Sequence, residues 1–108
     1  MTNWAAEDEK LVTLAKGART RVGAKSGAAL RDTTGRTYSS AEVNTEFLQL
    51  SATQLVVGQA IASGATGIEA IVICLDEHFS EQDETLIKKF SQTAQIILIN
   101  LRGERIDA

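Results

Sequence analysis

Two short and almost purely apolar runs constrain the fold of this chain more than any other feature. They are IEAIVICL, from Ile68 to Leu75, and IILINL, from Ile96 to Leu101. Such runs are typical of interior strands of a sheet, because a strand that is covered on both faces has no side that meets water. Between them, Ser80 to about Ser91 has apolar residues at helical spacing and begins like a capping box, so we expect a helix there. Strand, helix and strand in this order predict a crossover unit of a layered α/β domain.

A helix, a β-hairpin and a second helix precede this unit. We expect them at Ala5 to about Arg19, at Ser26 to Arg31 with Arg36 to Ser40, and at Phe47 to Ser63. Apolar residues occupy nearly every face of the second helix, so it should be buried against the sheet and covered on its outer side as well. Gly58 within it predicts a close approach of a neighbouring backbone. The order is α-β-β-α-β-α-β, and the predicted fold is a three-layer α/β/α domain with a mixed sheet that spans residues 1–108.

Composition excludes several classes of protein. Apolar residues make up 44% of the 108 positions, which is too many for a disordered chain, and the single cysteine, Cys74, excludes a disulfide scaffold. No run approaches the roughly 20 apolar residues of a membrane-spanning helix. The stretch from Met1 to Lys10 carries acidic residues where a secretory signal needs basic and then apolar ones, so we expect a cytoplasmic protein.

The charge balance argues against a protein that binds duplex DNA. There are 11 basic and 14 acidic residues and a net charge of −3, whereas such proteins have a basic excess that displaces counterions from phosphate. A local basic cluster remains at Lys16, Arg19, Arg21 and Lys25. Three of these four residues lie where the first helix should end, and the helix dipole explains cations at that place.

Several scaffold segments, taken in order, resemble the cytidine deaminase family between about residues 7 and 103. They are Gly27-Ala28-Ala29-Leu30, Gly35-Arg36-Thr37-Tyr38, the helix that opens with Ser51-Ala52-Thr53 and ends with Ala60-Ile61-Ala62-Ser63-Gly64, and the strands Ala70 to Ile73 and Ile97 to Leu101. The element order expected for this chain is also that of the family. The resemblance therefore implies a cytidine-deaminase-like fold.

The resemblance also implies where a catalytic site would lie, and this chain departs from the family there. Those deaminases hold a zinc ion between two helix N-termini, with Cys-Ala-Glu on one helix and Pro-Cys-x-x-Cys on the other. The zinc activates a water that attacks C4 of cytosine, and the glutamate moves protons. Here Ser51 takes the place of the first cysteine and Thr53 that of the glutamate, while Ser80 to Thr85 contains no cysteine. Neutral hydroxyls cannot replace thiolates or a proton-carrying carboxylate, so we expect no zinc and no catalytic residue.

The same two helix N-termini remain candidates for binding a ligand. In the family an asparagine and a glutamate bind the ribose, and Glu42 and Asn44 occupy the comparable stretch, with a spacing to Ser51 that is two residues shorter. The expected ligand-binding residues are Glu42, Asn44, Ser51, Thr53, Ser80 and Thr85. A cavity between helix N-termini suits an anion, a phosphate or a small polar ligand. The alternative is that side chains fill this cavity and that Ser51 and Ser80 act as helix caps.

Two other sites follow from residue type alone. One is a divalent-metal site of histidine, cysteine and carboxylate ligands. Its members would be Cys74, Asp76, Glu77, His78, Asp83 and Glu84. The other is a nucleophilic pair, with Ser51 or Cys74 as nucleophile and His78 as base. The simpler interpretation is a buried and inert cysteine, acidic residues in a loop before a helix, and serine caps.

The predicted function is therefore a zinc-free, cytidine-deaminase-like pseudoenzyme that binds a protein partner or a small nucleoside-like or RNA ligand. A genuine cytidine deaminase with an unusual site is the alternative, and an unrelated α/β interaction module is the third hypothesis. The resemblance implies a dimer or a tetramer, and the apolar helix from Phe47 to Ser63 favours burial against a second copy. We expect a homo-oligomer of one of these two sizes.

Overall fold

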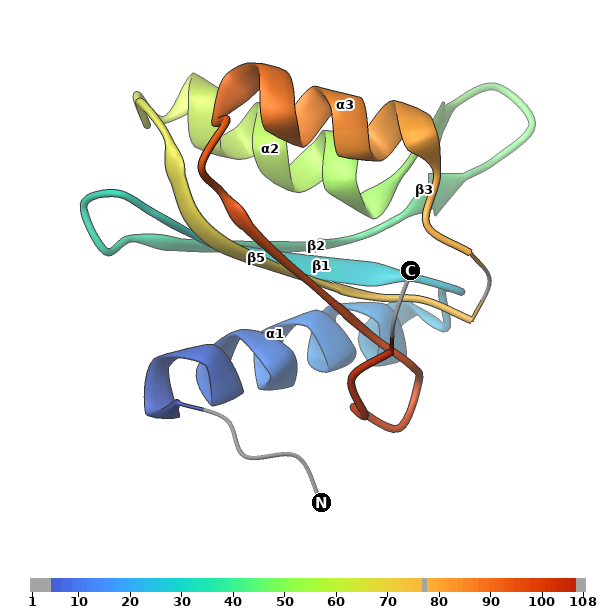
Figure 1. Ribbon diagram of the computed structural model, residues 1–108. Helices are drawn as coiled ribbons and strands as arrows, with labels where there is room; N and C mark the ends of the chain where they lie inside the picture. The colour runs from blue at the N-terminus through green and yellow to red at the C-terminus, as the bar shows by residue number, and fades with distance from the viewer. Residues whose placement is uncertain (1–4, 77, 107–108) are drawn as a thin grey trace.

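A mixed four-stranded sheet lies between one helix on one face and two helices on the other (Figure 1). The structure, a computed structural model, describes residues 5–76 and 78–106. Along the chain the elements are α1 (Ala6–Val22), β1 (Gly27–Asp32), β2 (Thr37–Ala41), β3 (Val43–Asn44), β4 (Gln49–Leu50), α2 (Ala52–Ala62), β5 (Ile68–Cys74), α3 (Glu81–Phe90) and β6 (Gln95–Ile99). The predicted α/β/α layers and element order are confirmed, with one addition, because β3 and β4 form a small separate hairpin.

The strand order in the sheet is β2-β1-β5-β6. Strands β5 and β6 run parallel, whereas β1 is antiparallel to both of its neighbours. Successive residues of the central strands face opposite layers: Leu30 and Ile71 belong to the core that α2 and α3 cover, whereas Ala29 and Val72 belong to the core that α1 covers. Two closed cores explain why the central strands are apolar at almost every position.

Helix α1 starts and ends as its charges predict. Acidic residues occupy its first turn, Arg19 and Arg21 occupy its last turn, and Gly23 ends it with a left-handed backbone (φ 68°). The helix extends beyond its predicted end to Val22, whose side chain is exposed. Neither α1 nor another helix in the described ranges has both the length and the apolar content that crossing a membrane requires.

The second helix begins at Ala52 and not at Phe47, because the residues before it form the β3–β4 hairpin. Thr45 Oγ1 accepts hydrogen bonds from the backbone N–H groups of Phe47 (3.3 Å) and Leu48 (2.9 Å). A threonine that binds nearby backbone groups in this way competes with helix formation. Ser51 then caps the helix, and Phe47 is left 88% exposed. The predicted helix start was wrong for this reason.

Helix α2 packs against the sheet but is open on its outer side. Val56, Val57 and Ala60 are buried, whereas Gly58 and Ile61 are exposed. Among the described residues, no atom outside the backbone of its own helix lies within 4 Å of the position that a Cβ on Gly58 would take. The expectations of complete burial and of a close approach at Gly58 were therefore wrong. One face of α2 contacts the sheet and one flank contacts α3, which accounts for apolar residues in more than one direction.

The close backbone approach occurs at Gly27, where β1 begins beneath α1. A Cβ at this position would lie 2.3 Å from the carbonyl oxygen of Ala15 and 3.1 Å from the backbone nitrogen of Arg19. Packed protein atoms do not come so close to a Cβ, so either the helix or the strand would have to move. Gly27 therefore sets the distance between α1 and the sheet.

We expect Gly27→Ala to destabilise the domain by about 1–3 kcal/mol, the usual effect of overpacking a core. Urea unfolding followed by far-UV circular dichroism at pH 7 measures this. Gly58→Ala is the matched control, because at an exposed helix position the same change should stabilise the domain by about 0.5–1 kcal/mol. Effects of the same sign at the two positions would contradict this account of the packing.

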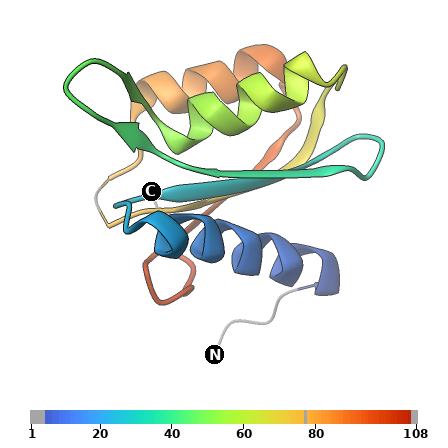
Figure 2. The ribbon, with the colours of Figure 1, turned by 180° about the vertical axis from the view of Figure 1, so that it is seen from behind.

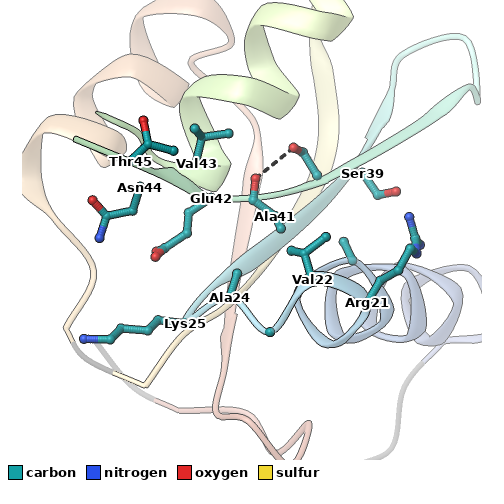
Figure 3. A pocket seen from close by; sticks show the side chains of 13 residues that line it. Arg21, Val22, Ala24, Lys25, Ser39, Ala41, Glu42, Val43, Asn44 and Thr45 are labelled. Carbon is teal, nitrogen blue, oxygen red and sulfur yellow. Dashed lines mark hydrogen bonds between the residues drawn. The ribbon is translucent and has the colours of Figure 1, made fainter. Parts of the chain in front are cut away.

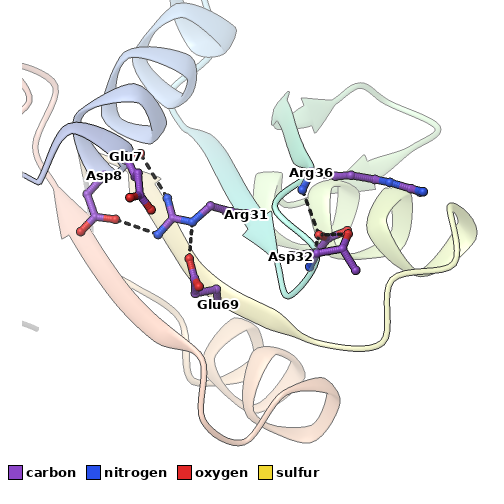
Figure 4. A network of polar contacts seen from close by, with 7 residues as sticks. Glu7, Asp8, Arg31, Asp32, Arg36 and Glu69 are labelled. Carbon is purple, nitrogen blue, oxygen red and sulfur yellow. Dashed lines mark hydrogen bonds and ion pairs between the residues drawn. The ribbon is translucent and has the colours of Figure 1, made fainter.

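Arg31, on β1, ties the start of α1 to the sheet (Figure 4). Its guanidinium group donates to Asp8 Oδ1 (3.1 Å) and to the backbone oxygen of Glu7 (3.2 Å), both in the first turn of α1. It also forms an ion pair with Glu69 of the neighbouring strand β5. The three contacts hold one helix and two strands at one corner of the domain.

Asp32, the next residue, organises the turn between β1 and β2. Its buried carboxylate accepts hydrogen bonds from Thr34 N–H (2.9 Å), Thr34 Oγ1 (2.7 Å), Arg36 N–H (3.0 Å) and the Tyr38 hydroxyl (3.2 Å). Burial alone would raise the pKa of Asp32, but these hydrogen bonds outweigh it and hold the pKa below its usual value. The ionised carboxylate is therefore the form that the fold prefers.

This lowered pKa predicts a pH-dependent contribution to stability. A group whose pKa is lower in the folded than in the unfolded chain stabilises the fold above the unfolded value of about 4, and the contribution is lost as the pH falls through the folded value. Asp32→Asn should therefore be less stable than the parent at pH 7 and should lose less stability on acidification. Thermal unfolding at pH 7, 5 and 3 measures both effects, with the exposed Glu46→Gln as control. Parallel pH curves for Asp32→Asn and the parent chain would refute the prediction.

Candidate functional site

A pocket of about 400 Å³ lies where β5 ends and where α2 and α3 begin. Both helices start at the same end of the domain, beside the β3–β4 hairpin (Figures 1 and 2). The apolar part of the wall consists of Ala52, Ile73, Leu75 and Phe79, and polar side chains from the helix starts and from the segment around β3 complete it. The carboxyl ends of strands are the usual place for sites in α/β sheets.

The pocket brings together five of the six predicted ligand-binding residues. They are Glu42, Asn44, Ser51, Thr53 and Ser80. The structure does not place Thr85 in this cavity. Helix α3 begins at Glu81, so Thr85 lies one turn into the helix, on an exposed face that it shares with Lys88 and Lys89. That turn of helix carries Thr85 away from the pocket, while a binding role for the other five residues stays a prediction.

Ser51 and Ser80 are the N-caps of α2 and α3. Ser51 Oγ accepts from Gln54 N–H (3.0 Å) and the side-chain oxygen of Gln54 accepts from Ser51 N–H (2.8 Å), which completes a capping box. Ser80 Oγ accepts from Asp83 N–H at 3.0 Å. The two caps are linked, since the Ser51 hydroxyl donates to Asp83 Oδ1 at 2.9 Å. Both serines therefore have the capping role that the simpler interpretation predicts.

Thr53 contributes a buried hydroxyl group without a partner. The residue lines the pocket and is 1% exposed, and its Oγ1 has no hydrogen-bond partner among the residues that the structure describes. Leaving a buried hydroxyl unpaired costs about 1–3 kcal/mol, so native proteins rarely do so. A ligand that enters the pocket and presents a polar atom to Thr53 would supply the missing hydrogen bond.

The charges around the pocket are mainly negative. Glu42, Asp76 and Asp83 contribute carboxylates, against the single ammonium group of Lys25. Free helix N-termini attract anions, but here Asp83 lies in the first turn of α3 and contacts the cap of α2. A phosphate at the helix starts would therefore be repelled by carboxylates at the place where free backbone N–H groups could otherwise bind it. The pocket suits a neutral or cationic ligand better than an anion.

A second hollow, of about 710 Å³, adjoins the pocket along the end of α1 and the edge strand β2 (Figure 3). The two hollows share Lys25, Glu42 and Asn44, whose side chains extend to the same side in this view. Ser26 Oγ donates to Glu42 Oε1 at 2.8 Å, which holds the carboxylate in place. Glu42 and Asn44, the pair compared with the ribose-binding residues, thus lie where the two hollows meet.

The other two candidate sites gain no support. Cys74 is buried in β5 with its Sγ 3.5 Å from the backbone oxygen of Asn100, and burial raises the pKa of the thiol, which disfavours the reactive thiolate. In the described part of the chain, no hydrogen bond joins His78 to Ser51 or Cys74. Within the same residues, no three side chains of His, Cys, Asp or Glu lie close enough together to hold a metal ion. Glu77 lies outside the described residues.

A family model described as cytidine deaminase-like matches residues 4–103. The chain belongs to the cytidine deaminase-like family. Among solved structures, the cytidine deaminase from Burkholderia pseudomallei is 21% identical and superposes with a TM-score of 0.75, covering 98% of this chain and 91% of its own. The cytidine deaminase from Mycobacterium tuberculosis is 17% identical with a TM-score of 0.68, covering 88% of this chain and 85% of its own.

The cytidine deaminase from Mycobacterium leprae gives a TM-score of 0.64 at 16% identity, covering 92% of each chain. At these identities the likeness establishes the cytidine-deaminase-like fold, as predicted, and not the activity. A comparison with curated proteins finds no significant match.

The resemblance to cytidine deaminases implies a zinc ion at the helix starts, so the side chains present there can be compared with the ligands that zinc requires. The helix starts present the hydroxyls of Ser51, Thr53 and Ser80 and the carboxylate of Asp83, and the same pocket is also lined by Glu42, Asp76 and His78. Zinc sites use three or four ligands drawn from thiolates, imidazoles and carboxylates. Ligand types are therefore present, but in the described residues no three of them lie close enough together to hold a metal ion, and the helix starts themselves offer one carboxylate among neutral hydroxyls. This arrangement does not fit zinc.

The contact between Ser51 and Asp83 escaped the sequence analysis. The pattern Ser80-x-x-Asp83 predicts a cap and places Asp83 in the first turn of a helix, but no local signal identifies a partner 32 positions away. Lys25 and Phe79 were missed for the same reason, since the fold alone brings them to the pocket.

Proposed function

We propose that this domain binds a small, neutral, nucleoside-like molecule in the pocket at the starts of α2 and α3, without a metal and without converting it. The buried Thr53 hydroxyl carries the proposal, because it lines the pocket and lacks a hydrogen-bond partner in the described residues. An unpaired buried hydroxyl destabilises the ligand-free domain. We expect such a group at a place where a bound ligand supplies the missing hydrogen bond.

The composition of the pocket matches the parts of such a ligand. A planar ring would pack on Ile73, Leu75 and Phe79, and Glu42 and Asn44 would accept hydrogen bonds from hydroxyl groups. The volume of about 400 Å³ lies within the range of about 300–1,000 Å³ that is usual for small-molecule pockets. The three carboxylates argue against a nucleotide or an RNA strand, because each phosphate would be repelled.

The side chains at the helix starts do not supply the groups that would convert the ligand. Hydrolytic deamination needs an activated water and a carboxylate that moves protons. The resemblance assigns the place of that carboxylate to Thr53, and a threonine hydroxyl stays protonated at pH 7. Bound cytidine would therefore remain cytidine.

Thr53→Val should have opposite effects on stability and on binding. Valine has nearly the shape of threonine but no hydroxyl, so the ligand-free domain should gain about 1 kcal/mol when the unpaired group is removed. The same change should weaken the binding of cytidine or uridine roughly 3- to 10-fold, the value of one hydrogen bond. Isothermal titration calorimetry and urea unfolding measure the two effects.

Thr85→Val is the matched control, because Thr85 lies on the exposed face of α3 and should leave affinity unchanged. Cytidine monophosphate should bind more weakly than cytidine. An affinity that does not change in Thr53→Val would refute the proposed role of the pocket. Release of uridine and ammonia from cytidine by the purified protein would instead favour the alternative function, a genuine cytidine deaminase.

We also propose that the protein is a homo-oligomer, either a dimer or a tetramer. We propose a cytoplasmic location for it. Phe47 in the β3–β4 hairpin is 88% exposed and Val22 at the end of α1 is 67% exposed. Large apolar side chains that are exposed to water favour burial against another protein surface. A second copy of the same chain can supply that surface, as in most homo-oligomers.

Light scattering after size-exclusion chromatography should therefore give a multiple of the single-chain mass of 11.6 kDa. Phe47→Ser should shift the population towards the monomer, whereas Glu46→Ser, at the exposed polar residue beside it, should not. A strict monomer of the unchanged protein at all concentrations would end this part of the proposal.

A further inference from the structure

A side-chain hydrogen bond joins the two helix starts that form the pocket. Ser51 Oγ, at the N-cap of α2, donates to Asp83 Oδ1, in the first turn of α3, at 2.9 Å. The two helices lie side by side and begin at the same end of the domain (Figures 1 and 2). The contact therefore links the two helix starts directly.

Each member of this pair is also fixed by a second hydrogen bond. Ser51 Oγ accepts from Gln54 N–H, and Asp83 N–H donates to Ser80 Oγ, both at 3.0 Å. A serine hydroxyl has one proton to donate, and here that proton points to Asp83. A helix N-terminus is the positive end of a macrodipole, so one carboxylate at the junction of two such ends stabilises both.

We infer that Ser51 and Asp83 form a metal-free clamp, which holds the starts of α2 and α3 together at the place where the family resemblance implies a zinc ion. One carboxylate and neutral hydroxyls fit this hydrogen-bonded arrangement and do not fit zinc. The negative charge of Asp83 meets the positive helix ends directly. The pocket therefore keeps its shape without a metal.

The clamp differs from a general preference for acidic residues at helix starts. Glu81 and Glu84 also lie in the first turn of α3, and both are exposed. Each of them interacts with the dipole of α3, but neither is hydrogen-bonded to the cap of α2 among the contacts of the described residues. The contribution of Asp83 should therefore depend on Ser51, whereas that of Glu84 should not.

A double-mutant cycle on the full chain tests this dependence. Asp83→Ala should lower the thermal midpoint by about 4–8 °C, and Glu84→Ala, which removes a carboxylate from the same turn, should lower it much less. In a chain that already carries Ser51→Ala, adding Asp83→Ala should produce only a small further decrease.

Exchanging the two side chains keeps the test decisive if an alanine variant does not fold. Ser51→Asp retains a good N-cap but places a second carboxylate against Asp83, so the thermal midpoint should fall. Adding Asp83→Ser to that variant restores one hydroxyl and one carboxylate in exchanged positions and should recover most of the loss. No recovery would overturn the clamp.

The metal-free part of the inference has its own readout. Elemental analysis of the purified protein should find no stoichiometric zinc, and neither dialysis against EDTA nor equimolar Zn²⁺ should shift the thermal midpoint. One zinc per chain with a fall of the midpoint on chelation would overturn it, as would additive effects of Ser51→Ala and Asp83→Ala. All these measurements use ligand-free protein, so their outcome is independent of nucleoside binding.

Discussion

Burial of the two central strands on both faces is the constraint from which the rest of the structure follows. Strands β1 and β5 send alternate residues into two cores, one covered by α1 and the other by α2 and α3. Each core closes only if helices pack tightly on its side, and at Gly27 the helix backbone comes so near that a Cβ has no room. A sheet covered in this way leaves its edges and the ends of its strands available for function.

The carboxyl end of β5 is where two helices begin, and helix starts carry backbone N–H groups that need partners. Serine caps meet this need in both helices, and the contact between Ser51 and Asp83 connects the caps. In this chain a hydrogen-bonded carboxylate therefore lies between the two helix starts. Family membership follows from the scaffold, whereas chemistry follows from the few side chains at this junction.

Two hydroxyls at the start of α2 illustrate the distinction between structure and function. Ser51 Oγ both donates and accepts a hydrogen bond, so its role within the fold is complete. Thr53 Oγ1, two residues later, is buried against the pocket and has neither kind of partner in the described residues. The first hydroxyl stabilises the helix start, and the second is the one that a bound molecule would stabilise.

Hydrophobic periodicity, helix caps and turn composition determined the fold class, the element order and most element boundaries, because these signals act over a few neighbouring residues. Only the tertiary structure decided which face of α2 is open at Gly58 and that Thr85 points away from the pocket. It also decided that Ser51 is hydrogen-bonded to Asp83, while Thr53 Oγ1 has no hydrogen-bond partner in the described part of the chain. Local sequence sets the preferred backbone shape of a segment. Burial and hydrogen-bond partners depend on what packs against that segment from distant parts of the chain, and such partners leave no local signal.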